Sequence, residues 1–160
     1  MRPVTWLGAA LRALAFAGAI ACSDGVGPAR EAVYSATLSG ANERPPRSSG
    51  ASGLATFRVT GDRADYVVTA SGLTGPPTVA HLLIGAREAT AGLVIVRLDL
   101  VGSSGTIAAG TIDLGRPITF NNTTISGDSL RTLFDRGGTY VNVSTAAYPG
   151  GEIRGQVERQ

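Results

Sequence analysis

Short runs of alternating apolar and polar residues recur along this chain, separated by breaks rich in glycine and proline. The clearest pair, residues 54–60 and 64–71, flanks Gly61-Asp62-Arg63, which predicts a β-hairpin with a three-residue loop. In the first run, one face carries only apolar side chains: Ala55, Phe57 and Val59. Antiparallel strands with one buried face have this alternation, so the pattern predicts antiparallel sheet.

Similar runs cover most of the remaining chain. They predict strands over residues 33–38, 79–84, 92–101, 106–112, 118–120, 140–145 and 152–157. The last two flank Pro149-Gly150-Gly151, where two glycines allow the chain to reverse. One helix is predicted over residues 129–136, with Asp128 as its N-cap and Gly137-Gly138 at its end.

About eight short strands and one short helix predict an all-β fold, an antiparallel Greek-key sandwich or barrel. The chain of 160 residues suits a single domain, which we place at residues 31–160. A domain of this length can bury a sufficient core without disulfides.

The N-terminus has the pattern of an export signal. Arg2 and Arg12 supply positive charge before an apolar run over residues 13–21, which is too short to span a bilayer. We therefore expect residues 1–21 to be a signal peptide that is removed from the mature protein.

Cys22 is the only cysteine, so no disulfide can form within the chain. The stretch Ala19-Ile20-Ala21-Cys22 resembles a bacterial lipobox, in which the cysteine is lipidated and becomes the first mature residue. This predicts a lipid anchor at Cys22 and a tether over residues 22–30. The alternative is an ordinary signal peptide cut near Ala21, which leaves a free thiol.

Removal of the signal peptide changes the net charge. The full chain has 14 basic residues, all arginine, and 12 acidic residues. Without Arg2 and Arg12, 12 basic residues balance 12 acidic ones, so the formal net charge is zero. A neutral domain without an arginine cluster argues against a nucleic-acid partner.

Five stretches in a fixed order resemble a known family: residues 40–46, 53–57, 80–85, 140–143 and 149–156. They read GANERPP, GLATF, AHLLIG, YVNV and PGGEIRGQ. From about Ala32 to Glu158 the chain resembles the CHRD domain, named for chordin and also common in exported bacterial proteins, here of the lipoprotein type. The resemblance implies an immunoglobulin-like or superoxide-dismutase-like sandwich. In chordin, such domains belong to an extracellular protein that binds growth factors.

The resemblance also marks individual residues, for which we expect structural roles. They are Glu43, Pro45, Pro46, His81, Asn142, Pro149, Gly150, Gly151, Glu152, Arg154 and Gly155. Glu43 lies in a polar loop before two prolines, where it can cap a sheet edge or supply an oxygen ligand to calcium. Glu152 and Arg154 lie two apart in a predicted strand and so share a face. They either recognise a partner or form an exposed charge network with Glu43, which is worth ~0–1 kcal/mol.

His81 is the only histidine. Family members often read Ala-His-Ile-His at residues 80–83 and Asn-Val-His-Thr at residues 142–145. Leu83 and Ser144 therefore stand at two of about three histidine positions, which leaves His81 alone. A catalytic first-row metal usually needs about three protein ligands with nitrogen or sulfur. We therefore expect no metal site and no cofactor, and predict a structural imidazole at His81 that bonds a backbone group.

No catalytic residue is predicted, because no G-x-S-x-G elbow is present and a catalytic triad would have to use His81. The leading hypothesis is a non-enzymatic cell-envelope lipoprotein whose CHRD-like domain is a binding or scaffold module for a protein or envelope polymer. Cys22 would hold it at the periplasmic leaflet of the outer membrane or at the cell surface. Without lipidation the protein would be secreted or periplasmic. The alternative is a metal-binding protein or metalloenzyme on a dismutase-like sandwich.

Overall fold

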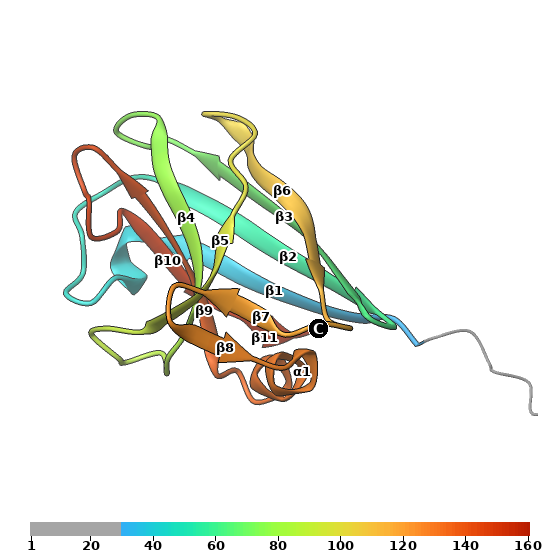
Figure 1. The fold of residues 1–160 in the computed structure, drawn as a ribbon. Helices are drawn as coiled ribbons and strands as arrows, with labels where there is room; N and C mark the ends of the chain where they lie inside the picture. The colour runs from blue at the N-terminus through green and yellow to red at the C-terminus, as the bar shows by residue number, and fades with distance from the viewer. Residues whose placement is uncertain (1–29) are drawn as a thin grey trace, which may run out of the picture.

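One large antiparallel sheet forms most of the molecule (Figure 1). The computed structural model describes residues 30–160. The strands of the sheet are β1 (Ala32–Ser39), β2 (Ser52–Thr60), β3 (Arg63–Ser71), β4 (Pro77–Ile84), β5 (Leu93–Leu98), β6 (Gly105–Asp113), β9 (Thr139–Thr145), β10 (Ile153–Gln156) and β11 (Glu158–Arg159). Their order is β5-β4-β9-β10-β1-β2-β3-β6, and β11 also pairs with β1.

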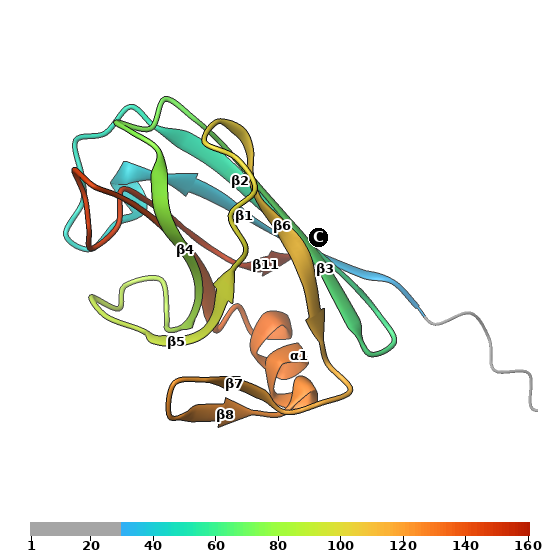
Figure 2. The same cartoon turned by 45° about the horizontal axis from the view of Figure 1, so that its top comes forward.

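The sheet curls until its two edge strands nearly meet. Leu100 bridges to Ala108, and the N–H of Ala109 donates to the carbonyl of Asp99 at 3.2 Å. Figure 2 shows β5 and β6 diverging from this contact toward the opposite end. The neighbours β3–β6, β4–β9 and β10–β1 are not consecutive in sequence, which requires long connections between strands. The result confirms the predicted all-β, antiparallel Greek-key sandwich or barrel.

The β2–β3 hairpin confirms the predicted alternation and corrects its loop. Ala55, Phe57 and Val59 are buried, whereas Arg58 and Thr60 on the other face are exposed. The loop has two residues rather than three, because Arg63 already pairs with Thr60. Gly61 turns the chain with a φ of 52°, a conformation that glycine adopts readily. Tight pairing therefore continues to the end of both strands.

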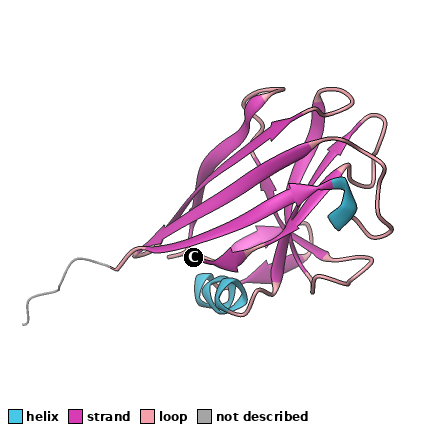
Figure 3. Ribbon diagram, turned by 180° about the vertical axis from the view of Figure 1, so that it is seen from behind, coloured by secondary structure: helices cyan, strands magenta, loops and turns pink. Residues whose placement is uncertain are grey.

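Helix α1 (Gly127–Asp135) packs its apolar side against the inner face of the sheet. Phe134 is fully buried, and its ring centroid lies 5.1 Å from those of Tyr34 and Phe57. Burying an aromatic side chain of this kind stabilises the fold by roughly 1.5–3 kcal/mol. Figure 3 shows α1 at one end of the strands, and the short 3-10 helix η1 (Gly40–Asn42) beside the sheet.

The start of α1 differs from the prediction. Ser126 is the N-cap, and its hydroxyl accepts a hydrogen bond from the N–H of Ser129 at 3.1 Å. Asp128 instead lies in the first turn and pairs with Arg131 at 3.2 Å. Gly137 has a φ of 61° and ends the helix as predicted.

Two short strands were absent from the prediction. Strand β8 (Thr123–Ile125) pairs with β7 (Ile118–Phe120) in a separate two-stranded sheet, and β11 has only two residues. Strands of two or three residues show little alternation, and β7 was predicted only because Gly115-Arg116-Pro117 marks a turn before it. The β7–β8 hairpin matters below, because Phe120 contacts the only histidine.

The predicted signal peptide (residues 1–21), the lipidation site Cys22 and nearly all of the tether (residues 22–30) lie outside the described residues. Across residues 30–160, no helix has the length and apolar character needed to cross a membrane.

Candidate binding site

A row of polar side chains crosses the outer face of four neighbouring strands. In register, Arg154 of β10 pairs with Asn142 of β9, Asn142 with His81 of β4, and His81 with Arg97 of β5. Directly opposed residues in an antiparallel sheet point to the same side. Val143, the next residue after Asn142, points to the inner face and is fully buried. The row therefore lies outside the barrel core.

A cavity of about 310 Å³ lies over the part of this row formed by His81, Asn142 and Arg154. Strands β4 and β9 form its floor, and the segments 43–47, 90–92 and 149–150 form its walls. Its polar lining consists of Glu43, Arg44, Arg47, His81, Thr90, Tyr140, Asn142, Ser144 and Arg154. The volume is at the lower end of the range for small-molecule sites, roughly 300–1,000 Å³. The cavity is therefore large enough for a small ligand.

Residues that are far apart in the sequence meet in this cavity. Six of the eleven residues marked by the resemblance line it: Glu43, His81, Asn142, Pro149, Gly150 and Arg154. Sequence reasoning treated them as separate structural positions and missed that they share one site. It also missed Arg44 and Arg47 as lining residues. The family stretches were the one sequence signal that could have located the cavity, because four of the five contribute residues to its lining.

Glu43 is a buried carboxyl with few hydrogen-bond donors. It is 4% exposed, and the only donor to it within residues 30–160 is Nδ2 of Asn142, at 3.3 and 3.4 Å from its two oxygens. Burial raises the pKa of Glu43 to about 7, and the nearby positive charges of Arg154 and Arg47 only partly oppose this. The carboxyl group therefore changes its charge near neutral pH.

Glu152 is also buried, but both oxygens of its carboxylate accept hydrogen bonds. Its carboxylate accepts hydrogen bonds from Ser49 Oγ at 2.8 Å, Thr145 Oγ1 at 2.7 Å, and Thr74 N and Oγ1 at 3.0 and 2.9 Å. Burial raises the pKa of Glu152, but these hydrogen bonds outweigh that effect and hold the pKa below its ordinary value. Glu152 thus joins three separate segments as an ionised structural group.

The predicted exposed pair of Glu152 and Arg154 is wrong. Both side chains are buried, at 0% and 3% exposure, and they do not bond each other. Strand β10 begins only at Ile153, and the chain bends at Glu152. Glu152 consequently reaches Thr145 on the inner side of β9, whereas Arg154 lies on the outer face. Arg154 also makes no ion pair with Glu43 among the described residues.

Arg154 holds one wall of the cavity in place. Its guanidinium donates to the carbonyls of Ala89 at 2.7 Å, Ala86 at 3.0 Å and Arg87 at 3.4 Å. The same group lies 3.5 Å from the ring centroid of Tyr140, a close cation–π contact. Burial lowers the pKa of Arg154. Most of its donors are occupied by the protein itself.

The other two arginines of the cavity differ in how many donors they have free. Arg44 makes a forked pair with Glu88, with distances of 2.9 Å from Nε and 3.1 Å from Nη2. Nε of Arg47 is buried without a hydrogen-bond partner in the part of the chain that the structure describes. The Arg47 guanidinium lies only loosely over Tyr148, at 6.0 Å from the ring centroid. Since the Arg47 side chain makes no hydrogen bond or ion pair within residues 30–160, its Nη groups are unused donors at the cavity.

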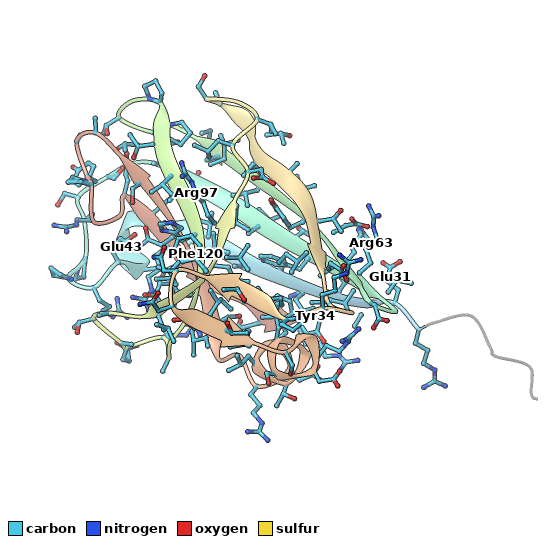
Figure 4. The ribbon with its side chains drawn as sticks, viewed as in Figure 1. Glu31, Tyr34, Glu43, Arg63, Arg97 and Phe120 are labelled. Atoms are coloured by element: carbon cyan, nitrogen blue, oxygen red, sulfur yellow. The ribbon has the colours of Figure 1, made fainter. Side chains whose placement is uncertain are left out.

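His81 is partly buried and packs edge-on against Phe120, with 5.7 Å between ring centroids. Burial and the charge of Arg97 lower its pKa below the ordinary value. Its ring makes no hydrogen bond with any described residue, so the expected backbone hydrogen bond is not found. Figure 4 shows Arg97 and Phe120 on the same half of the molecule as Glu43.

Leu83 and Ser144 line the same cavity as His81. The two positions at which the resemblance implies further histidines are therefore neighbours of His81 in space. In this chain they contribute an alkyl group and a hydroxyl. Within residues 30–160, no three His, Cys, Asp or Glu side chains lie close enough together to hold a metal ion.

The remaining marked residues shape the backbone around the cavity. Gly151 has a φ of 128°, and a Cβ there would lie 2.6 Å from Oε1 of Glu43. A Cβ on Gly155 would collide with the carbonyl of Thr37 on β1. Pro45 and Pro46 are exposed, and the Arg44–Pro45 peptide bond is cis. The glycines allow the chain to approach Glu43 and β1 closely.

An antiparallel sandwich with a polar cavity on its outer face defines a domain suited to binding or scaffolding. The CHRD domain family model matches residues 34–157, so this chain belongs to the CHRD domain family. The match confirms the resemblance seen in the five sequence stretches. No curated protein and no solved structure gave a significant match.

Proposed function

We propose that this protein is a non-enzymatic binding module of the cell envelope, and that the cavity lined by Glu43, Arg47 and His81 is its binding site. The observation that supports this most directly is the state of Glu43, a buried carboxyl with one long hydrogen bond, near Arg47, whose side chain makes no hydrogen bond or ion pair with any described residue. Membership of the CHRD domain family supports a binding or scaffold role.

The contrast between the two buried glutamates supports a ligand site. A carboxylate that serves only the fold is expected to be fully hydrogen-bonded, as Glu152 is. Leaving Glu43 nearly unsatisfied has a cost of about 1–3 kcal/mol in stability. Groups with such perturbed pKa values cluster at functional sites. A bound partner would supply the interactions that Glu43 and Arg47 lack.

The placement of the cavity suits a domain held by a lipid anchor at Cys22. The described chain starts at the end of the sheet where Arg30 lies in the same surface hollow as Gly61 and Asp62. Figure 4 shows Glu31 and Arg63 at that end and Glu43 at the other. A domain tethered in this way can present the cavity away from the membrane, at the periplasmic leaflet of the outer membrane or at the cell surface.

Site-specific photo-crosslinking in intact envelopes tests the binding site. A photoreactive residue at the exposed rim position Pro149 is compared with one at exposed Thr60, at the far end of β2. We expect an adduct from Pro149 alone, and its loss when Arg47→Gln is added. Equal adducts from both positions, or an adduct unaffected by Arg47→Gln, would contradict the assignment of the cavity as the binding site.

The anchor is tested by membrane fractionation of a Cys22→Ala variant. We expect the protein to move from the membrane fraction to the soluble fraction, with its folded domain unchanged. Processing and membrane attachment that survive the substitution would exclude lipidation at Cys22.

A metal-binding role is the second candidate, because Leu83 and Ser144 stand beside His81 where relatives often carry histidines. Metal analysis of protein purified without a histidine tag decides between the two. Stoichiometric copper or zinc that disappears in a His81→Ala variant would favour the metal site over the proposed binding module.

A further inference from the structure

The charged groups of the cavity leave one cation available to a ligand. Arg44 is paired with Glu88, and Arg154 donates to three backbone carbonyls. The Arg47 side chain lines the cavity and makes no hydrogen bond or ion pair within residues 30–160; its Nε is buried against the protein, so its Nη groups are the donors left for a ligand. Since the guanidinium fork matches the geometry of a carboxylate, the free donors indicate an anionic ligand of that shape.

The uncharged lining favours an organic anion over a small inorganic one. Val79, Leu83 and Pro149 line the cavity beside the polar groups. A volume of about 310 Å³ accommodates a small molecule with an apolar body and a charged end. Such mixed linings are typical of small-molecule sites, where a few polar groups fix the orientation of the ligand.

We propose that this cavity binds a small organic carboxylate, and that Glu43 takes up one proton from solvent when the ligand binds. The proposal rests on the proposed function, because it names the ligand class of the same site. The ligand remains ionised and pairs with Arg47, while the protonated Glu43 donates its O–H to the ligand carboxylate. No bond within the ligand is made or broken.

The proton uptake follows from the repulsion between two carboxylates in one site, which favours the neutral form of one of them. Glu43 is the group that protonates, because it is buried and its pKa already lies at about 7. The groups facing Glu43 are Asn142 and Tyr140 from β9, Arg154 from β10, and Arg47 from its own loop.

The two other cavity groups that could lose a proton near neutral pH, His81 and Tyr140, do not change their charge between pH 7 and 8. The pKa of His81 is lowered from 6.5 by burial, so its ring is neutral in that window. Burial raises the pKa of Tyr140 above 10. A change in affinity above pH 7 therefore reports on Glu43, and the Glu43→Gln variant identifies any contribution that His81 makes below pH 7.

Isothermal titration calorimetry of the purified full chain with benzoate at pH 6 and pH 8 tests the proposal. If only the protonated form of Glu43 binds, the affinity falls about tenfold from pH 6 to pH 8. Repeating the pH 8 titration in buffers of different ionisation enthalpy should give an uptake of about one proton per benzoate. Benzamide, the uncharged analogue, should not bind.

Three variants separate the roles. Glu43→Gln should bind benzoate equally at pH 6 and pH 8 without proton uptake, and Arg47→Gln should lose about tenfold or more in affinity. Glu31→Gln is the matched control at an exposed glutamate outside the cavity, and should keep the pH dependence of the wild type. Benzoate binding that is independent of pH, or a pH dependence that survives Glu43→Gln, would overturn the proposal.

Failure of this proposal is distinguishable from failure of the proposed function. If benzoate does not bind while the crosslink from Pro149 still requires Arg47, the carboxylate ligand is wrong and the binding site stands. If inorganic phosphate binds and benzoate does not, the carboxylate ligand is likewise wrong and the binding site stands. If neither benzoate binding nor the crosslink is found, both proposals fall.

Discussion

Nδ2 of Asn142 lies 3.3 and 3.4 Å from the two oxygens of Glu43 and is the only hydrogen-bond donor to that carboxyl within residues 30–160. Both distances are longer than the usual N–H···O separation of about 2.9–3.0 Å. One long, shared donor cannot replace the water that burial removes from a carboxylate. The contact therefore leaves Glu43 poised between its charged and neutral forms.

Because of Glu43, the free energy of unfolding of the wild type should fall as the pH rises from about 4.5 to about 7. The pKa of Glu43 is raised from 4.5 to about 7 on folding, so the folded state binds more protons than the unfolded state between these values. The stabilising effect is complete below pH 4.5 and is lost as the pH rises to about 7. We therefore expect the difference in unfolding free energy between Glu43→Gln and wild type to change by about 2–3 kcal/mol in favour of the variant from pH 5 to pH 8, measured by urea unfolding. Equal pH dependence in both proteins would contradict this.

Glu152 should behave in the opposite way. Its pKa is lowered on folding, so it stabilises the fold above the unfolded pKa and loses this effect as the pH falls. Glu152→Ala leaves the hydroxyls of Ser49 and Thr145 and the N–H of Thr74 without their acceptor. We expect a loss of about 2–4 kcal/mol at pH 7 by thermal or urea unfolding. A loss below about 0.5 kcal/mol would show that the carboxylate is not a structural anchor.

Arg154→Lys should loosen the wall of the cavity although it keeps the charge. Lysine cannot reach the carbonyls of Ala86 and Ala89 together while stacking on Tyr140 as the guanidinium does. We expect a loss of about 1–2 kcal/mol in stability and faster amide hydrogen exchange in residues 85–92. Arg97→Lys, in the same row of the sheet, serves as the control and should leave that exchange unchanged.

The N-cap of α1 can be assigned by a pair of alanine substitutions. Ser126→Ala removes the acceptor of the Ser129 N–H and should destabilise the protein by about 1 kcal/mol. Asp128→Ala removes only an exposed pair with Arg131, worth about 0–1 kcal/mol. A larger loss for Asp128→Ala in chemical denaturation would restore the cap expected from sequence.

The strands were predictable because their signal is local. The alternation around Phe57 and the glycines after α1 follow from neighbouring residues, and the five family stretches identified the fold. The helix start was wrong by two positions because Ser126 and Asp128 are both good N-cap residues. Only the geometry of the turn distinguishes them.

The cavity was not predictable from the same signals. It depends on the register that aligns Asn142 and Arg154, on the consecutive strands β9 and β10, with His81 on β4, far earlier in the sequence. The burial of Glu43 depends in turn on the loop that folds over that row. Equally, the bend before β10 separates Glu152 from Arg154, which simple alternation placed on one face.

The most direct test of the cavity as a carboxylate site is a carbon-13 NMR titration of the Glu43 carboxyl, with and without saturating benzoate. Glu43→Gln assigns its signal among the five glutamates of the chain. We predict a midpoint at about pH 7 for the free protein and a higher midpoint with benzoate bound. A midpoint near pH 4.5 that benzoate does not change would contradict the account.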